Sequence, residues 1–377
     1  MIFYGKQSIN QDDIDAVVEV LRSDFLTQGP KVVEFENDLA NYCGSQYAKV
    51  VSNGTAALHL AYLAIGLKQG DIVWTTPNTF VATANAALYC GATVDFVDID
   101  SKTYNLSISS LKKRLVLAKK ENTLPKLVVP VHFSGQSCEM KEIWSLSKEY
   151  GFKIVEDACH ALGGEYLSKK VGSCEYSDMA VFSFHPVKMI TTGEGGAIMT
   201  NNKGLDDKIA LLRSHGITKD ESQFKNESDG DWYYEQQAQG FNYRLTDIQA
   251  ALGISQLKRL DSFVVKRREI AKRYLSELQD IELPYQHPDT NSSWHLFVIQ
   301  VKNRKAIQQQ LKGQGIGSQI HYIPVVSQPY YQDMGHDIKQ YPVTDVYYRS
   351  ALSIPLYCNF SSVEQELVIS SMKALLR

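Results

Sequence analysis

Apolar and polar residues alternate in blocks along the first 200 residues of the chain. Apolar runs of three to six residues are typical of buried strands, and segments between them, such as Ala56–Ile65 and Met140–Tyr150, have apolar residues at helical spacing. This alternation predicts an α/β fold whose mostly parallel, seven-stranded sheet is covered on both faces. The predicted strands are Ala48–Ser52, Ile72–Trp74, Val94–Val97, Leu127–Val131, Lys153–Glu156, Met179–Phe184 and Ala197–Thr200.

An amphipathic helix is predicted near the start of the chain. Asn10 is a suitable N-cap, with Asp13 three residues later. The apolar residues that follow lie at positions i, i+3, i+4 and i+7 and therefore share one helix face. They are Ile14, Val17, Val18 and Leu21.

A long helical pattern begins at Thr246 and runs toward Leu278. Thr246 and Gln249 form a capping box at its start. We predict that this helix carries the chain from a large domain, residues 1–255, into a smaller C-terminal α+β domain, residues 256–377. Strands are expected in the smaller domain at Leu296–Val301 and Gly317–His321.

Between these patterns, residues 218–231 are polar and have no periodicity. The segment reads TKDESQFKNESDGD. It predicts a long exposed loop, of the mobile kind found near active sites.

Composition narrows the class of protein. The chain has 377 residues, 44% of them hydrophobic, and a net charge of −3, which gives no reason to expect nucleic acid as a partner. No apolar run approaches the length of a membrane span, and the amino terminus lacks a signal-peptide pattern. The six cysteines include no C-x-x-C pair, so we expect reduced thiols and a cytoplasmic protein rather than disulfides or a zinc site.

The stretch that follows the strand Met179–Phe184 is the strongest chemical signal. A lysine, Lys188, comes shortly after this strand and before a glycine-rich turn at residues 193–196. A lysine at the edge of an α/β sheet, beside groups that bind phosphate, suits a Schiff base with pyridoxal phosphate. Taken alone, the same residues also fit an ordinary surface lysine.

Two other strand ends carry matching chemistry. Asn53-Gly54-Thr55 opens a helix whose free N–H groups could bind a phosphate, although many turns of this kind hold no ligand. Asp157, 31 residues before Lys188, could pair with the protonated ring nitrogen of pyridoxal phosphate. His160 is placed to reach the face or the phenolic oxygen of the cofactor. The combination, rather than any single part, predicts a fold-type I pyridoxal phosphate enzyme.

Two further interpretations of these strand ends stay open. Phe80, after the strand that ends at Trp74, could stack on a planar ring, although a phenylalanine at such a position is more often a plain core residue. Glu156, Asp157 and His160 could form a metal site, but no complete ligand pattern accompanies them. We therefore expect no metal.

The motifs together resemble the DegT/DnrJ-type sugar aminotransferases, pyridoxal phosphate enzymes that aminate keto-sugars carried on a nucleotide. The resemblance extends from about residue 4 to about residue 357. The matching motifs are Leu26-Thr27-Gln28-Gly29-Pro30, Ser52-Asn53-Gly54-Thr55-Ala56-Ala57-Leu58, Thr75-Thr76-Pro77, Phe80-Val81-Ala82-Thr83-Ala84-Asn85, Glu156-Asp157-Ala158, Phe182-Ser183-Phe184-His185-Pro186-Val187-Lys188, Gly193-Glu194-Gly195-Gly196, Phe241-Asn242-Tyr243-Arg244-Leu245 and Gln319-Ile320-His321-Tyr322.

Within this family the chain is most similar to the pseudaminic acid branch, the 4-aminotransferases of UDP-4-keto-6-deoxy-N-acetylhexosamines. The features that indicate this branch are His160-Ala161-Leu162-Gly163, His185-Pro186-Val187-Lys188, Ile190-Thr191-Thr192 and Arg213-Ser214-His215-Gly216. The Phe-His-x-x-Lys form also occurs in the UDP-4-amino-arabinose branch. Assignment to the UDP-bacillosamine or dTDP-amino-sugar enzymes also stays open.

The resemblance implies a role for each matching residue. Lys188 is expected to hold pyridoxal phosphate as an imine, Asp157 to pair with its ring nitrogen and Phe80 to stack on its ring. Ser183 and the turn of Gly54, Thr55 and Ala56 are expected to hold its phosphate. Asn242 is expected to reach the phosphate in a neighbouring subunit, which implies a homodimer with shared sites. The expected sugar-nucleotide contacts are Tyr4, Asp24, Phe25, Leu26, Thr27, His185, Gln319, Ile320, His321 and Tyr322.

The implied reaction transfers an amino group from L-glutamate to the C4 keto group of the sugar by ping-pong kinetics, with Lys188 moving the proton. The implied product is UDP-4-amino-4,6-dideoxy-N-acetyl-beta-L-altrosamine. A sugar dehydratase of the same fold typically has His in place of Lys188, and a regulatory protein without turnover would not need Lys188, Asp157 and Ser183 together. An amino-acid aminotransferase would need an arginine that binds a substrate carboxylate through both of its oxygens, and Arg349 or Arg244 could serve.

Overall fold

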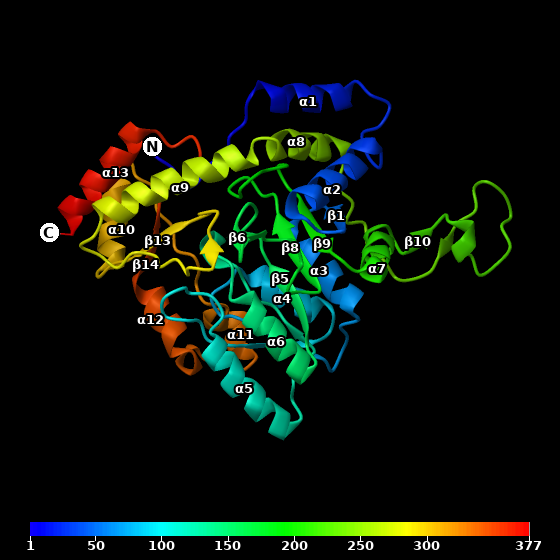
Figure 1. Ribbon diagram of the computed structural model, residues 1–377, viewed down its shortest axis with the longest axis horizontal. Helices are drawn as coiled ribbons and strands as arrows, with labels where there is room; N and C mark the ends of the chain where they lie inside the picture. The colour runs from blue at the N-terminus through cyan, green and yellow to red at the C-terminus, as the bar shows by residue number, and fades with distance from the viewer. Residues whose placement is uncertain (377) are drawn as a thin grey trace.

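A central seven-stranded sheet organises the computed structural model, which describes residues 1–376 (Figure 1). The strand order is β1-β9-β8-β5-β4-β2-β3. Strand β9 runs antiparallel to both of its neighbours, and the other neighbouring pairs are parallel. The strands are β1 (Tyr47–Val51), β2 (Ile72–Thr75), β3 (Thr93–Phe96), β4 (Leu127–Val128), β5 (Lys153–Asp157), β8 (Met179–Ser183) and β9 (Gly196–Thr200).

All seven predicted strands are confirmed, and the sheet is mostly parallel as expected. The largest difference is in β4, which was expected to reach Val131 but ends at Val128. A single bridge from Val131 to Asp157 continues the pairing beyond it. The carboxyl ends of β5 and β8 lie side by side, since Asp157 is in register with Val181.

Helices cover both faces of the sheet, because successive side chains of each strand point to opposite faces. Val155 and Val181 pack with α3 (Gly54–Ile65), α4 (Val81–Tyr89) and α7 (Lys203–Arg213). On the other face Phe182 packs with α2 and α8, and Ile154 with α5 and α6. These four helices are α2 (Pro30–Cys43), α8 (Asp247–Leu257), α5 (Ile108–Glu121) and α6 (Met140–Tyr150).

A separate apolar cluster forms the core of the C-terminal part of the chain and includes Ile2 from the N-terminus. In Figure 1 this part, with helices α9, α10 and α13, lies to the left of the large sheet. Residues 325–341, by contrast, contribute Val325 and Tyr331 to the core of the large sheet. The elements of the C-terminal part are α9 (Leu260–Glu277), β13 (Phe297–Gln300), α10 (Arg304–Gly313), η3 (Val325–Ser327), α11 (Pro329–Asp333), η4 (Ile338–Gln340), α12 (Pro342–Ser350), β14 (Ala351–Ile354) and α13 (Ser362–Leu375).

The predicted helix starts are confirmed. Helix α1 (Gln11–Leu21) follows the N-cap Asn10, which forms a capping box with Asp13, and Thr246 and Gln249 form a capping box on α8. The expectation of one long helix from Thr246 to Leu278 is wrong, because α8 ends at Leu257 and α9 begins at Leu260. The apolar period continues across the break, so the pattern could not reveal it.

The predicted strand Gly317–His321 is also wrong. This segment forms only an isolated bridge between Gln319 and Ser353, at the side of the two-stranded sheet of β13 and β14. The Gly317 N–H donates to Ile2 O at 2.7 Å, so the segment is held between the N-terminus and β14.

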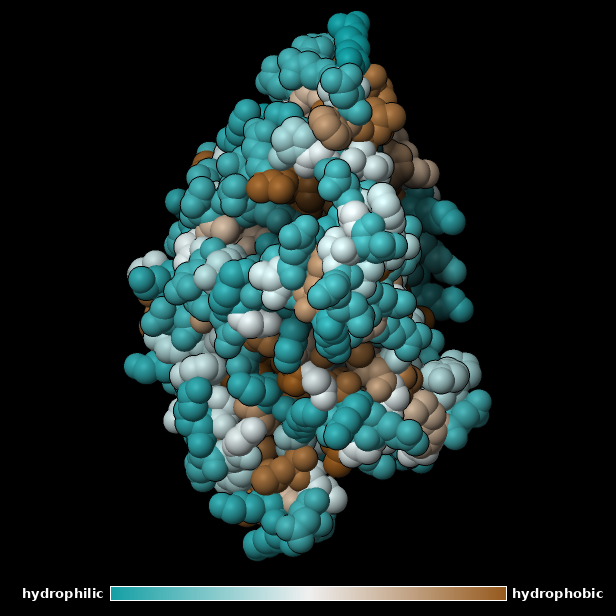
Figure 2. All heavy atoms as spheres, turned by 90° about the vertical axis from the view of Figure 1, so that its right-hand side faces the viewer, coloured by the Kyte–Doolittle hydropathy of each residue, from teal (hydrophilic) through white to brown (hydrophobic). Residues whose placement is uncertain are grey.

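The polar segment 218–231 lies in an arm that extends from the body of the molecule (Figure 1). The arm is closed by the antiparallel strands β10 (Ile217–Thr218) and β11 (Glu235–Gln236) and contains η2 (Glu221–Gln223). Its polar residues are mostly exposed, as expected, and so is Trp232, at 72%. Figure 2 views the molecule from this side and shows hydrophobic patches among hydrophilic side chains.

The remaining short elements lie near the sheet. Strands β6 (Glu165–Tyr166), β7 (Lys169–Lys170) and β12 (Thr290–Asn291) form a three-stranded antiparallel sheet. A turn of 3-10 helix, η1 (Phe133–Gly135), follows β4. Because β12 belongs to the C-terminal part of the chain and pairs with β6, this small sheet connects the C-terminal part to the part that contains the large sheet.

Candidate active site

Lys188 lies in the loop that joins β8 to β9. The loop is closed at its base, because the N–H of Phe184 donates to Gly195 O at 2.8 Å and that of Thr192 to Phe184 O at 3.0 Å. Burial lowers the pKa of Lys188, and the neighbouring Cys159 and Asp157 oppose this only in part. A lysine of this kind has more of the neutral, nucleophilic amine than a surface lysine has.

Asp157 ends β5, next to β8, and points to the face covered by α3 and α4. Its carboxylate is buried and accepts the Thr83 hydroxyl at 2.6 Å and the Cys159 N–H at 3.2 Å. Its charge is one of the two that act on Lys188. The structure thus brings together the two residues that the sequence analysis placed at the centre of the chemistry.

The turn before α3 lies against the end of β8. A Cβ on Gly54 would be 2.9 Å from the Ser183 Cβ, and one on Gly196 would be 2.7 Å from the Asn53 backbone. The Asn53 side chain accepts the Ala56 N–H at 2.8 Å, so that donor of the predicted phosphate turn is already used. Within residues 1–376 the N–H groups of Gly54 and Thr55 have no recorded acceptor.

A group of histidine and tyrosine side chains faces this sheet edge from the C-terminal part. The Tyr322 hydroxyl is 2.9 Å from His160 Nε2. The His295 ring lies 4.4 Å from that of His160, and the His321 Nδ1 is 2.8 Å from the Ser353 hydroxyl. Burial lowers the pKa of all three histidines, and the Lys188 charge lowers them further, in the case of His321 to about 3.

Several polar atoms around this edge are buried without a partner in the described part of the chain. They include Asn78 Nδ2, His160 Nδ1 and His295 Nδ1. An unpaired buried donor or acceptor costs about 1–3 kcal/mol, so atoms of this kind at one edge indicate a place where a polar ligand or water binds.

Phe80 presents an open aromatic face near the same place. It is 57% exposed and its ring lies 6.0 Å from that of Tyr322. The interpretation of Phe80 as a plain core residue is therefore wrong. The Tyr4 ring lies 5.4 Å from that of His321, so Tyr4 joins the same group.

The other predicted site residues are more dispersed. Asp24, Phe25, Leu26 and Thr27 are exposed between α1 and α2, where the Leu26 carbonyl accepts the Asp247 N–H at 3.0 Å. His185, Gln319 and Asn242 are also exposed, and Ile320 is half-buried. Within residues 1–376, no recorded hydrogen bond or ring contact joins the 24–27 segment or Asn242 to Lys188 or Asp157.

Sequence reasoning misses three residues of the site. Thr83, which binds Asp157, lies inside a matching motif, but the motif assigns it no role. Asn78 accepts the Tyr322 N–H at 3.3 Å, and His295 lies beside His160. Asn78 and His295 come from irregular segments that no periodicity marks, so only the fold brings them to the site.

Arginines that could bind a second carboxylate are differently placed. Arg349, on α12, forms a bidentate ion pair with Asp345 at 2.6 and 3.0 Å on an exposed surface. Arg244 forms an isolated bridge with Val51 near the start of α3. Arg349 is thus already paired with a carboxylate of this chain, which argues against a role in binding a substrate carboxylate.

Residues 1–376 offer neither a metal site nor a membrane span. No group of three or more His, Cys, Asp or Glu side chains in this range is placed to hold a metal ion. No helix in the same range combines the length and the apolar character that crossing a membrane requires.

A half-buried lysine in the loop after β8 and a buried carboxylate at the end of the neighbouring strand β5, with a glycine turn beside them, form an arrangement typical of α/β enzymes with a reactive lysine. Residues 7–373 match the model of the DegT/DnrJ/EryC1/StrS aminotransferase family, and the chain belongs to this family. It is an aminotransferase by family and by the names of its relatives.

Several similar proteins agree with this assignment. The chain is 41% identical to the UDP-4-amino-4,6-dideoxy-N-acetyl-beta-L-altrosamine transaminase of Campylobacter jejuni subsp. jejuni, with 100% of this chain and 98% of that protein covered. It superposes on Helicobacter pylori PseC, an aminotransferase involved in the biosynthesis of pseudoaminic acid, with a TM-score of 0.91, 32% identity and coverage of 100% and 99%. A sugar aminotransferase from Streptococcus pneumoniae in its PLP-form gives a TM-score of 0.89 at 28% identity, covering 100% and 98%.

Proposed function

We propose that the protein uses pyridoxal phosphate to transfer an amino group from L-glutamate to the C4 keto group of a UDP-linked 4-keto-6-deoxy-N-acetylhexosamine. The product is UDP-4-amino-4,6-dideoxy-N-acetyl-beta-L-altrosamine. The observation that carries the proposal is the placement of Lys188 in the loop after β8, with the buried Asp157 at the end of the neighbouring strand β5. The names of the Campylobacter and Helicobacter relatives support the choice of sugar.

The residues around this pair fit pyridoxal phosphate. Asp157 offers a buried carboxylate for the ring nitrogen, and Phe80 an exposed ring face. The turn of Gly54 and Thr55 lies beside Ser183, where a phosphate would be held. The N–H of the next residue, Ala56, donates to the capping side chain of Asn53. Lys188 would hold the cofactor covalently through Nζ. When bound, the cofactor supplies an electron sink for the substrate carbon.

The protein side of the mechanism follows from the environment of each group. Lys188, with its lowered pKa, is the base that takes a proton from the substrate carbon and returns it to a neighbouring atom. The Asp157 carboxylate accepts hydrogen bonds from the Thr83 hydroxyl and the Cys159 N–H, which hold it in position to pair with a protonated ring nitrogen. His160 stays neutral because burial lowers its pKa, so it serves as a hydrogen-bonding group and not as a cation.

The sugar nucleotide binds along the C-terminal wall of the site in this proposal. Tyr4, His321 and Tyr322 form one group there, with Gln319 and Ile320 just before them. His185 and the exposed segment of Asp24, Phe25, Leu26 and Thr27 supply the remaining contacts that the family resemblance implies. The alternative substrates are UDP-4-amino-arabinose, UDP-bacillosamine and dTDP-amino-sugar precursors.

The working unit in this proposal is a homodimer in the cytoplasm. Asn242, the residue expected to reach the partner's phosphate, is exposed on the single chain. Trp232 and other large apolar side chains of this chain are also exposed, which is typical of surfaces that a second subunit covers. We also keep the division into a large domain, 1–255, and a small domain, 256–377, supported by the separate C-terminal core.

A substrate panel tests the proposal. The purified protein is incubated with pyridoxal phosphate, L-glutamate and one UDP- or dTDP-linked keto-sugar at a time, and formation of 2-oxoglutarate and of the amino-sugar is followed. We expect turnover of the UDP-4-keto-6-deoxy-N-acetylhexosamine at least ten times that of the other sugars. If another keto-sugar were turned over faster, that sugar would be the substrate in place of the one proposed. A dehydrated sugar formed without consumption of glutamate would indicate a dehydratase.

A further inference from the structure

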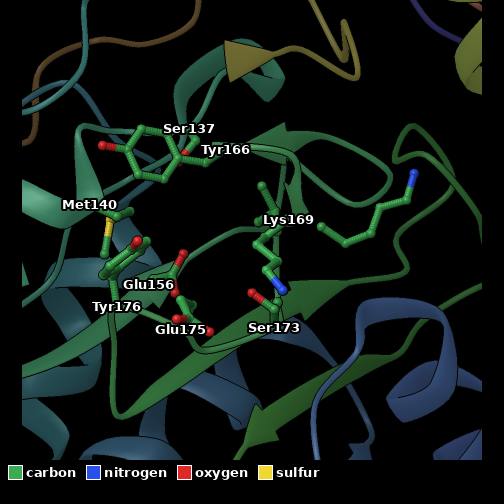
Figure 3. A pocket seen from close by; sticks show the side chains of 11 residues that line it. Ser137, Met140, Glu156, Tyr166, Lys169, Ser173, Glu175 and Tyr176 are labelled. Atoms are coloured by element: carbon green, nitrogen blue, oxygen red, sulfur yellow. The ribbon is translucent and has the colours of Figure 1, made fainter. Parts of the chain in front are cut away.

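Glu156 is the immediate neighbour of Asp157 on β5 and points to the opposite face of the sheet. It is buried, and its side chain lines a cavity together with Tyr166, Lys169 and Tyr176 (Figure 3). Its Oε1 accepts the Ser177 hydroxyl and its Oε2 lies 2.6 Å from His132 Nε2. Both oxygens of this buried carboxylate are therefore hydrogen-bonded, although the proposed chemistry takes place on the other face.

His132 contacts both residues of this pair. Its side chain bonds Glu156, and its backbone N–H donates to the Asp157 carbonyl oxygen at 3.0 Å. The bridge between Val131 and Asp157 reinforces this attachment. His132, in the segment that follows β4, is thus hydrogen-bonded to both of the last two residues of β5. The second of these residues, Asp157, carries the carboxylate of the candidate site.

The hydrogen bonds of His132 also fix the orientation of its ring. The backbone N–H of Cys138 can only donate and lies 3.1 Å from His132 Nδ1, so Nδ1 is an acceptor. The proton that the ring donates to Glu156 is therefore on Nε2.

A network of this kind has a cost that an apolar core would avoid. A buried carboxylate and imidazole must be desolvated, and losing one partner leaves the other unsatisfied. In return, each hydrogen bond restricts the position of the strand end. Packing alone does not fix a carboxylate to the fraction of an ångström that pairing with a ring nitrogen requires.

We propose that His132 and Glu156 act as positioning residues that hold the Asp157 carboxylate in place from the opposite face of β5. This inference rests on the proposed function, because it presumes that Asp157 pairs with the cofactor ring. Neither residue touches the substrate or cofactor, and both act through the backbone of β5.

A double-mutant cycle tests the proposal. His132→Phe keeps a planar ring and Glu156→Leu a branched side chain of similar length, and both remove the hydrogen bonds. Each is expected to lower kcat about tenfold, within the ~100-fold that a misplacement of about 1 Å can cost. KM for glutamate should stay within about twofold, and affinity of the apoprotein for pyridoxal phosphate, measured by fluorescence, should fall about threefold. In an Asp157→Asn background the same substitutions should have no further effect.

Conservative and control variants separate positioning from general damage. Glu156→Gln keeps the shape and can still accept from His132, so it should stay within about twofold of the wild type. Lys169→Ala, at the exposed side of the same cavity, should change nothing. If the His132→Phe variant does not fold, the Ser177→Ala variant is measured in its place, and its kcat is expected to be about threefold lower than that of the wild type.

The outcomes distinguish this inference from the proposed function. An equal loss in the wild-type and Asp157→Asn backgrounds would show that His132 acts independently of Asp157 and would overturn the inference, as would unchanged kcat and cofactor affinity in both His132→Phe and Glu156→Leu. Failure of the wild-type protein to bind pyridoxal phosphate, or no effect of Asp157→Asn itself, would instead refute the proposed function.

Discussion

The two walls of the candidate site are built in different ways. The sheet wall consists of strand ends and the turns that follow them, and it contains Lys188, Asp157, Ser183 and Gly54. The C-terminal wall consists of irregular segments and contains Tyr322, along with His295 and His321. The first is held by backbone pairing of neighbouring strands, and the second by side-chain contacts such as that between Tyr322 and His160.

This difference indicates a division of labour. Groups on paired strands keep fixed positions, as a reaction common to a whole family requires. Irregular segments tolerate substitution with little effect on the core, which suits contacts that differ from one sugar to the next. Changes in the sheet wall should therefore affect every substrate, and changes in the C-terminal wall should affect the choice of substrate or the stability of the wall.

The largest effect is expected from Lys188→Ala. This substitution removes both the covalent attachment and the base, so turnover of every keto-sugar should fall by at least about 10⁴-fold. Borohydride reduction followed by peptide mass spectrometry should find the cofactor on Lys188 in the wild type and nowhere in the variant. Lys169→Ala is the matched control, and turnover above one hundredth of wild type in Lys188→Ala would contradict the assignment.

Asp157→Asn should have the second largest effect. The amide keeps the size of the side chain but loses the charge that favours a protonated ring nitrogen, and kcat should fall about 100-fold with any sugar. Steady-state kinetics with two different keto-sugars measures this. Thr83→Val, which removes one hydrogen bond to Asp157, is the milder companion with an expected loss of a few-fold. If kcat fell with only one of the two sugars, the proposed division of roles between the sheet wall and the C-terminal wall would be wrong.

A smaller effect is expected from Gly54→Ala. The new Cβ would lie 2.9 Å from the Ser183 Cβ, which narrows the turn proposed to hold the phosphate. Affinity for pyridoxal phosphate should fall about tenfold, measured by equilibrium dialysis, with KM for the sugar unchanged once the enzyme is saturated. Gly313→Ala is the matched control, because a Cβ there meets nothing within 4 Å. Equal affinities for both variants would place the phosphate elsewhere.

The C-terminal wall should show the smallest effect, as a dependence of stability on pH. Burial lowers the pKa of His321 to about 3, so between about pH 6.5 and 3 the unfolded state binds a proton that the folded state does not. Stability therefore falls as the pH drops, by about 1.4 kcal/mol per such histidine between pH 7.5 and 5.5.

The variant His321→Gln isolates this contribution. Urea unfolding at the two pH values should show a loss of stability about 1.4 kcal/mol smaller than in the wild type, and the loss that remains includes the contributions of His160 and His295, which titrate in the same direction. His185→Gln, at an exposed position, is the control. An unchanged pH dependence in His321→Gln would show that the His321 ring takes up its proton over the same pH range in the folded and unfolded states, which would contradict the lowered pKa.

The sheet wall could be predicted from the sequence because apolar runs determine strands and strand ends determine where polar residues meet. Lys188 and Asp157 are examples, 31 residues apart and brought together only by the parallel pairing of β5 and β8. The family resemblance added roles for Gly54, Ser183 and Phe80 that periodicity could not supply. Those roles stay predictions until they are tested.

The C-terminal wall could not be predicted in the same way. His295 lies in an irregular segment, and its position beside His160 depends on how two distant parts of the chain pack. The same limitation explains the errors at Gly317–His321 and at the break between α8 and α9. Apolar spacing describes which side of an element is buried, but not where hydrogen bonding stops.

The closed loop between β8 and β9 limits how the chain can change length. Phe184 and Gly195 are hydrogen-bonded at its base and Lys188 lies between them, so an added or deleted residue would displace the lysine directly. The arm of residues 217–236 is not constrained in this way, because its two strands pair with each other and it extends away from the body of the molecule. Length variation should therefore collect in the arm, and a peptide tag or fluorescent label inserted near Ser228 should leave the folded core intact.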